Sequence, residues 1–70
     1  MVTIDIGHFS SAKQARTEIE VLLRAATNAR TDAARCRRKG DSDGAAHFET
    51  KAEDARKAAS HIRANLHLLP

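Results

Sequence analysis

The stretch "CRRKGDSDGA", residues 36–45, marks the place where the chain is expected to turn back on itself. Basic residues precede Gly40 and acidic residues follow it. Cations stabilise the C-terminal end of a helix and anions its N-terminal end, because the helix dipole is negative at the former and positive at the latter. The stretch therefore predicts the end of one helix, a left-handed residue at Gly40 and the start of a second helix.

Apolar residues continue outward from this turn in alternating steps of three and four. This spacing keeps side chains on one seam of a helix that packs against another helix, as in a coiled coil. Position numbers in facing pairs add up to 81 throughout, which predicts an all-α fold, an antiparallel two-helix hairpin. The two series are Ala12, Ala15, Ile19, Leu22, Ala26, Ala29, Ala33 and Cys36, and then Ala45, Phe48, Ala52, Ala55, Ala59, Ile62, Leu66 and Leu69.

Capping residues set the expected limits of the helices. Ser11 followed by Gln14 fits a capping box, and Ser10 is an alternative cap. The stretch "DSD" at 41–43 offers three caps for the second helix. We expect one domain, 1–70, with an extended arm at 1–9, a first helix from residue 10 or 11 to 39, a turn at 40–43 and a second helix from residue 42 or 43 to 69.

The register also predicts which charged residues meet across the hairpin. Arg16 and Arg63 are expected at the same level near the open end, where Glu20 is the nearby acid. Exposed ion pairs stabilise a fold by only about 0.2–1 kcal/mol each, so such pairs orient the helices more than they stabilise them. Two pairs are expected, one on each side of the seam: Asp32 with Lys51, and Arg30 with Glu49.

The first residues, "MVTIDIG", show a different period. Val2, Ile4 and Ile6 alternate with polar residues, which predicts a short strand. A single strand leaves its backbone groups unpaired. It would pair with a second subunit, join the sheet edge of a partner, or lie across the helices with its apolar residues on the hairpin.

Length and composition favour association with a second copy. A chain of 70 residues with a single Cys has no internal disulfide, and the Ala-rich middle of its seams gives a thin core. Apolar residues outside the seams remain to be buried, so we expect a homodimer, a four-helix assembly. The residues expected at its interface are Val2, Ile4, Ile6, Val21, Ala25, Ala58, His61 and Leu68.

Motifs of catalysis and metal binding are missing from the sequence. No His pair has a spacing of four, and no glycine-rich phosphate loop or nucleophile elbow occurs. We therefore expect no catalytic residues, no metal and no cofactor. The longest strongly apolar run is 21–23, far short of the ~20 residues of a membrane span. The N-terminus does not resemble a signal peptide, so a cytoplasmic protein is expected.

Small size, apolar surplus and exposed Arg favour a binding role. We expect a non-enzymatic protein-binding regulator or inhibitor that acts stoichiometrically on a larger protein, such as a phage-type anti-activator or an inhibitor of a host protein. Arg is enriched at protein interfaces. The residues expected to contact the partner are Arg16, Arg24, Arg56 and Arg63.

Two alternatives remain open at this point. The net charge of +3 and the pI near 9.6 are compatible with a nucleic-acid-binding regulator. The expected architecture resembles plasmid RNA-binding hairpin dimers in shape, without a shared motif. It is also similar to ribbon-helix-helix repressors, although the first helix is longer than in that family. The other alternative is an assembly piece within a larger complex.

Overall fold

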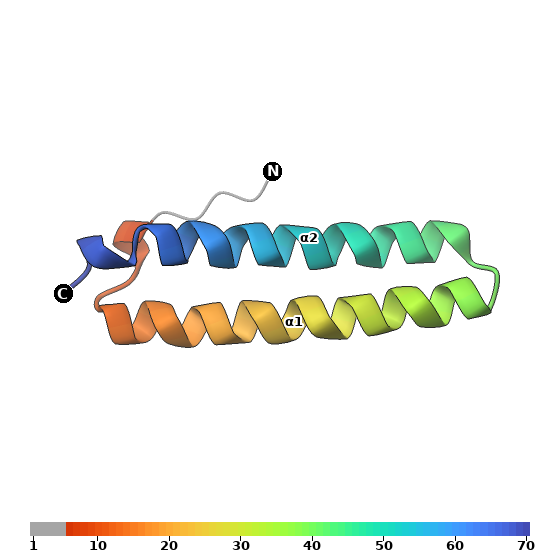
Figure 1. The fold of residues 1–70 in the computed structure, drawn as a ribbon, viewed down its shortest axis with the longest axis horizontal. Coiled ribbons are helices and arrows are strands. Elements are labelled where there is room, and N and C mark those ends of the chain that lie inside the picture. Colours follow the sequence, from red (N-terminus) through yellow and green to blue (C-terminus); the bar gives the residue numbers. More distant parts are fainter. Residues whose placement is uncertain (1–5) are drawn as a thin grey trace.

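The computed structural model describes residues 6–70, which form two long antiparallel helices (Figure 1). Helix α1 spans Ala12–Arg38 and helix α2 spans Ser42–Ala64. Short 3-10 helices flank them: η1, Ile6–His8, precedes α1, and η2, Leu66–Leu68, follows α2. The molecule measures 47 × 19 × 14 Å, so it is elongated and consists of a single pair of helices side by side. The predicted all-α hairpin is confirmed.

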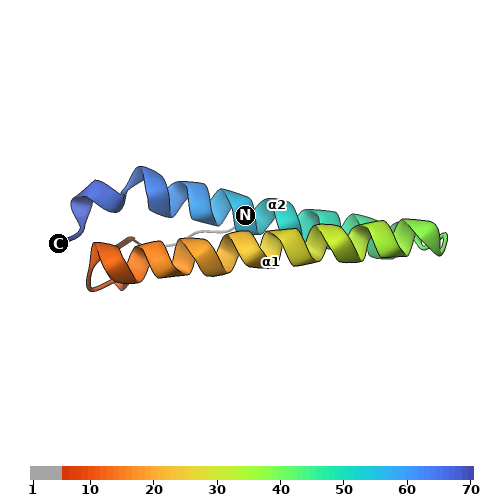
Figure 2. The same ribbon diagram turned by 60° about the horizontal axis from the view of Figure 1, so that its bottom comes forward.

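The two helices run alongside each other, as Figure 2 shows, and the predicted seams lie between them. Every position of both series is buried or half-buried. The core falls into two clusters, and each holds residues that the register places face to face, such as Ile19 with Ile62 and Ala29 with Ala52. The cluster at the open end holds Phe9, Ala15, Ile19, Ala59 and Ile62, with Leu22, Leu66 and Leu69 packed against it.

Alanine dominates the buried part of the described chain. Eight of the eleven buried apolar residues are Ala, and Ile62 is the largest side chain that is fully enclosed. Burial stabilises by about 0.8 kcal/mol per CH₂ group, so an Ala methyl contributes much less than a Leu or Ile side chain. The core is therefore thin near the turn and thicker at the open end.

The turn has the geometry of a Schellman motif. Gly40 has a φ of +78°, a conformation that favours glycine, as the sequence predicts. The Gly40 N–H donates to the Arg37 carbonyl oxygen at 3.0 Å, and the Asp41 N–H donates to the Cys36 carbonyl oxygen at 2.8 Å. Of the three candidate caps at 41–43, Asp41 is the one used, because its side chain accepts from the Gly44 N–H at 2.9 Å.

The start of α1 carries a modified capping box. The Ser11 hydroxyl accepts from the Gln14 N–H at 3.2 Å, as predicted. The reciprocal bond goes one residue further back, since Gln14 Oε1 accepts from both the N–H and the hydroxyl of Ser10, each at 2.8 Å. Both Ser residues that compete for the cap in the sequence are therefore engaged.

The predicted extent of the second helix, to residue 69, is wrong. Helix α2 ends at Ala64, where the Asn65 side chain turns back and donates to the His61 carbonyl oxygen at 2.9 Å. Short polar side chains such as Asn compete with the helix for backbone groups. The chain then tightens into η2, which still directs Leu66 and Leu69 onto the open-end cluster.

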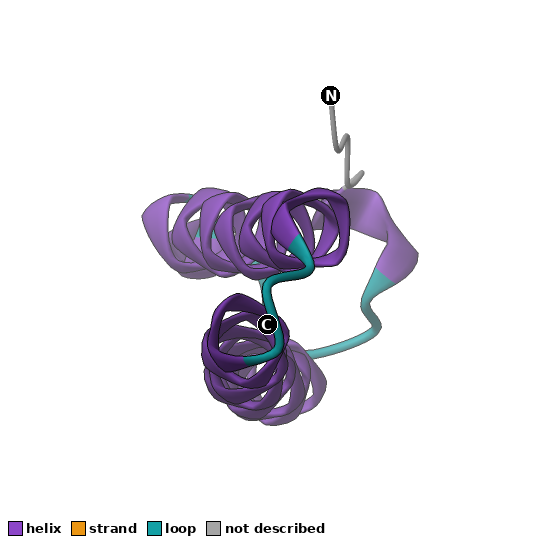
Figure 3. Ribbon diagram, turned by 90° about the vertical axis from the view of Figure 1, so that its right-hand side faces the viewer, coloured by secondary structure: helices purple, strands orange, loops and turns teal. Residues whose placement is uncertain are grey.

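Most of the strand expected in the extended arm at 1–9 lies outside the described residues, and the described part, 6–9, is not a strand. Ile6–His8 form the 3-10 helix η1 beside the C-terminal part of α2, and a loop leads from there to α1 (Figure 3). Phe9 is only 8% exposed and belongs to the same cluster as Ile19 and Ile62. The described end of the arm thus packs on its own hairpin, which is one of the arrangements considered for it.

Candidate binding surface

One side of the hairpin carries most of the Arg residues near the groove between the helices. Residues seven apart lie on nearly the same side of a helix, because two turns take 7.2 residues. Both helices follow this spacing on the side in question. This surface of the hairpin is called the Arg side below. It consists of Arg16, Leu23, Arg30 and Arg37 from α1 and Glu49, Arg56 and Arg63 from α2, with Glu20 and Glu53 at its margins.

A shallow hollow of about 250 Å³ lies at the open end of the Arg side. Arg16 and Arg63 line it from opposite helices, together with Glu20, as the register predicts. Its remaining lining is apolar: Ile19, Leu66 and the 38% exposed Leu23. The hollow therefore combines two guanidinium groups with a hydrophobic floor.

A second hollow lies on the same side, nearer the turn. Arg30, Arg37 and Arg56 line it with Glu49 and Glu53. The ion pair across the helices joins Arg37 to Glu49, and not Arg30 to Glu49 as predicted. Glu49 lies in the same hollow as both guanidinium groups, so the register alone does not decide between them.

Four guanidinium groups on this side have no acidic partner among the described residues. Among residues 6–70, no carboxylate lies within ion-pair distance of the side chains of Arg16, Arg30, Arg56 or Arg63. Glu53, which could reach Arg56, pairs with Lys57 at 3.3 Å. Within residues 6–70, the positive charge of the Arg side is thus only partly compensated.

The structure brings together three of the four Arg residues predicted to contact a partner. Arg16, Arg56 and Arg63 belong to the Arg side. Arg24 does not, because it lies midway between the seam residues Leu22 and Ala26 and so faces away from α2. Sequence reasoning missed Arg30 and Arg37 as members of the surface; their seven-residue spacing was the signal that could have found them.

Val21 and Ala25, two of the residues predicted for a dimer interface, lie on the side of α1 opposite to the Arg side. Ala25 lines a hollow there with Asp32, Phe48 and Lys51. Val21 is 48% exposed and Leu68 61%, and Ala25 and His61 are exposed as well.

Ala58 is only 2% exposed in the single chain, so it belongs to the core of the hairpin, and its place at a dimer interface stays a prediction. It lies seven residues after Lys51, just outside the seam. The coiled-coil pattern assigns only two residues in every seven to the seam, so it does not predict that Ala58 is buried. Val2 and Ile4 lie outside the described residues, and Ile6 begins η1.

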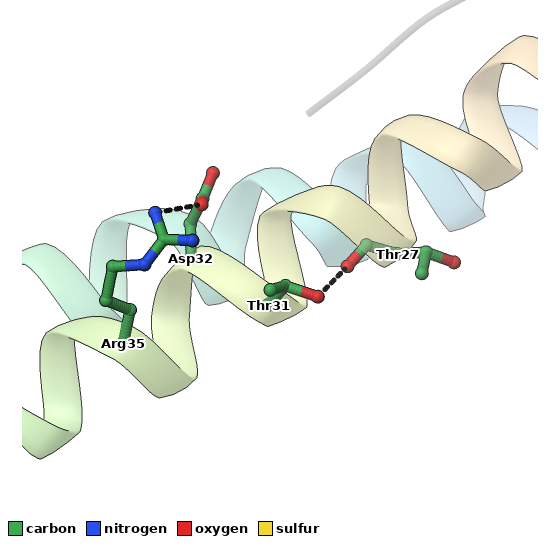
Figure 4. A network of polar contacts seen from close by, with 4 residues as sticks. All are labelled: Thr27, Thr31, Asp32 and Arg35. Carbon is green, nitrogen blue, oxygen red and sulfur yellow. Dashed lines mark hydrogen bonds and ion pairs between the residues drawn. The ribbon is translucent and has the colours of Figure 1, made fainter.

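The hollow on this opposite side is lined by one acidic residue, Asp32, and one basic residue, Lys51. Asp32 pairs with Arg35 within α1 at 3.3 Å, as Figure 4 shows. Lys51, its predicted partner, lines the same hollow and lies 5.9 Å from the centre of the Phe48 ring. Figure 4 also shows the Thr31 hydroxyl, which donates to the Thr27 carbonyl oxygen at 3.1 Å. The asymmetry between the two sides makes the Arg side the stronger candidate for a charged partner.

The described residues were also compared with the requirements of a metal site and of a membrane-spanning helix. No group of three or more His, Cys, Asp or Glu within residues 6–70 is arranged to hold a metal ion. Cys36 is a half-buried free thiol in the last turns of α1. Neither α1 nor α2 has the length and hydropathy needed to cross a membrane.

The described chain is thus a two-helix hairpin with one Arg-lined side. Comparison with known proteins finds no matching family model, no matching curated protein and no matching solved structure. What the chain binds is therefore inferred from the chemistry of the Arg side.

Proposed function

We propose that the chain is a small, non-enzymatic protein-binding regulator that acts stoichiometrically by covering a surface of a larger protein. The observation that carries this proposal is the Arg side, where Arg16 and Arg63, which have no acidic partner among the described residues, line one hollow with the exposed Leu23. Arg is enriched at protein interfaces and among the residues that dominate binding energy. A binder of this kind inhibits by occupying the surface, as anti-activators and antitoxins do.

The shape of the surface supports a protein ligand. Both hollows are open depressions on a molecule whose smallest dimension is 14 Å. Sites for small molecules enclose most of the ligand, whereas protein partners bind to wide and shallow surfaces. The Arg residues project from two packed helices, so their backbones are held in place before binding and less entropy is lost on association.

A homodimer is a second part of the proposal. The thin Ala core and the exposed Val21 and Leu68 support burial of the side opposite to the Arg side. The near balance of charge there lets two copies approach. Phe9 already covers part of the hairpin near the open end, so the contact would centre on Ala25 and leave the Arg side facing outward.

Nucleic acid is the second candidate ligand, and one observation favours it. The Arg residues from Arg16 to Arg37 extend over about 31 Å along the helix, at 1.5 Å per residue, which could follow a phosphate backbone. Binding of this kind weakens steeply with added salt, because counterions are released from the phosphates. A protein partner would show a shallower dependence.

Affinity capture from a nuclease-treated bacterial lysate tests the proposed function. We expect one protein to be recovered, and purified components to bind at a defined ratio near one to one in calorimetry. The doubly substituted R16E/R63E chain should lose the captured protein, whereas R24E/R38E, with the same change in net charge on the outer face of α1, should retain it. Loss of every partner after nuclease treatment would instead favour the nucleic-acid candidate.

A further inference from the structure

We propose that the Arg side binds an amphipathic helix of the partner that carries an apolar stripe flanked by carboxylates. The helix would lie along the groove between α1 and α2 and complete a three-helix arrangement. This inference rests on the proposed function and specifies the chemistry of the partner at the same surface.

The spacing of the Arg side fits a helix in the groove. Arg16 and Arg63 stand on opposite walls at one level, and Arg30 lies on the α1 wall two heptads further along. Seven residues of helix rise about 10.5 Å, so Arg16 and Arg30 lie about 21 Å apart along the axis. A partner helix of about four turns would therefore place acidic residues opposite both ends of this span.

The apolar residues that line the open-end hollow favour a partner helix with an apolar side chain between its carboxylates. Leu23 lies between Arg16 and Arg30 on α1 and is 38% exposed. Together with Ile19 and Leu66 it lines the open-end hollow. A Leu or Ile from the partner would bury this surface, and buried apolar area stabilises an interface while exposed ion pairs contribute little.

Acidic side chains on the same surface argue against a phosphate backbone. Glu20 lines the open-end hollow, and Glu49 and Glu53 line the other. A continuous row of phosphates would lie against these carboxylates, whereas a peptide can place its own carboxylates only opposite Arg. Of the described residues that line the two hollows, none is aromatic, so no ring is offered for stacking on bases.

A second copy of the chain is a poor occupant of this groove. A symmetric contact places the same surface of each copy against the other. The Arg side carries five Arg against three Glu, so such a contact would bring an excess of positive charge together. Charge complementarity therefore favours an acidic partner over self-association.

Fluorescence anisotropy with a designed peptide tests the inference. The probe is a labelled helix of about 18 residues, roughly 27 Å long, with Leu at steps of three and four, Glu on both flanks and Ala elsewhere. Controls are the same residues reordered so that Leu forms no stripe, the peptide with Lys in place of Glu, and a duplex RNA. At about 0.15 M salt, we expect the acidic amphipathic peptide to bind most tightly.

Matched variants locate the binding surface. We expect R16E/R63E to weaken peptide binding about tenfold or more, and L23A to weaken it severalfold. R24E/R38E should stay within about twofold, because Arg24 and Arg38 face away from the groove. All four substituted Arg residues are exposed, so circular dichroism should show unchanged helicity in both double variants.

Several outcomes would overturn the inference. These are equal binding of the reordered or Lys peptide, tighter binding of duplex RNA, an equal loss in R24E/R38E, or a change in the chain's own oligomeric state in R16E/R63E. Failure of the inference is distinct from failure of the proposed function. If R16E/R63E still captures a protein from the nuclease-treated lysate, the proposed function stands and the Arg-side inference fails. If the unaltered chain captures no protein from that lysate, the proposed function fails, whatever the result with the peptide.

Discussion

The backbone N–H of Ala12, the first residue of α1, donates a 2.8 Å hydrogen bond to the main-chain oxygen of Pro70. A helix N-terminus leaves its first N–H groups without partners inside the helix. Here one of them is satisfied by the segment that follows η2, which ties the two open ends together. The register of the hairpin is therefore held at the turn by Gly40 and at the open end by this bond.

Substitution of Ala52 tests the close approach of the helices. Ala52 is buried against Ala26 and Ala29, so A52L should overpack the seam and lower the free energy of unfolding by about 1–3 kcal/mol. A46L introduces the same side chain at an exposed position of α2 and should change stability by less than about 0.5 kcal/mol. Urea unfolding measures both, and equal stabilities of the two variants would contradict the register.

Gly40 tests the turn. Its φ of +78° costs an L-residue about 1–2 kcal/mol, although no atom within 4 Å would obstruct a methyl group. G40A should therefore lower the melting temperature, by about 4–8 °C for each kcal/mol in a chain of this size. G40N should lower it less, because Asn tolerates this conformation better. An unchanged melting temperature in G40A would exclude the left-handed turn.

Phe9 tests whether the arm packs on its own chain. F9A removes the only large aromatic side chain in the open-end cluster and should destabilise the fold by about 3 kcal/mol or more. H67A, at an exposed position of η2, should have an effect within about 0.5 kcal/mol. Thermal unfolding at several protein concentrations measures the loss. A loss that appears only at high concentration would place Phe9 between chains.

Ala25 tests the proposed homodimer. A25E puts a charge at the centre of the side opposite to the Arg side and should give a monomer in sedimentation equilibrium. L23E puts the same charge on the Arg side and should leave association unchanged. A monomeric unaltered chain, or a dimer that persists in A25E, would rule out this interface.

The spacing of apolar residues was sufficient to predict the hairpin, its register and its turn. A step of three and four reports which residues face the partner helix, and every seam position from Ala12 to Leu69 is buried or half-buried. The spacing does not report where an α-helix changes into a 3-10 helix. Leu66 and Leu69 follow the end of α2, at η2, and still pack against the open-end cluster, as they would if α2 continued. The end of α2 depends on Asn65, whose side chain could equally have pointed to solvent.

The candidate surface could be predicted only in part. The register placed Arg16 beside Arg63, because backbone geometry alone fixes their level. It named Arg30 as the partner of Glu49, whereas the ion pair joins Arg37 to Glu49, because long side chains reach more than one position along the groove. The burial of Ala58 likewise depends on packing outside the seam, which a periodic pattern does not describe.

The uneven distribution of side-chain size along the seam has a consequence for folding kinetics. Contacts beside the turn close short loops and those at the open end close long ones, and loop-closure entropy favours the short loops. The hairpin should therefore form first around Ala33 and Ala45, where little apolar area is buried, and last around Ile19 and Ile62, where most is. Interactions that form after the transition state mainly slow unfolding. I62V should then speed unfolding while leaving the folding rate almost unchanged, which stopped-flow measurements with denaturant can check.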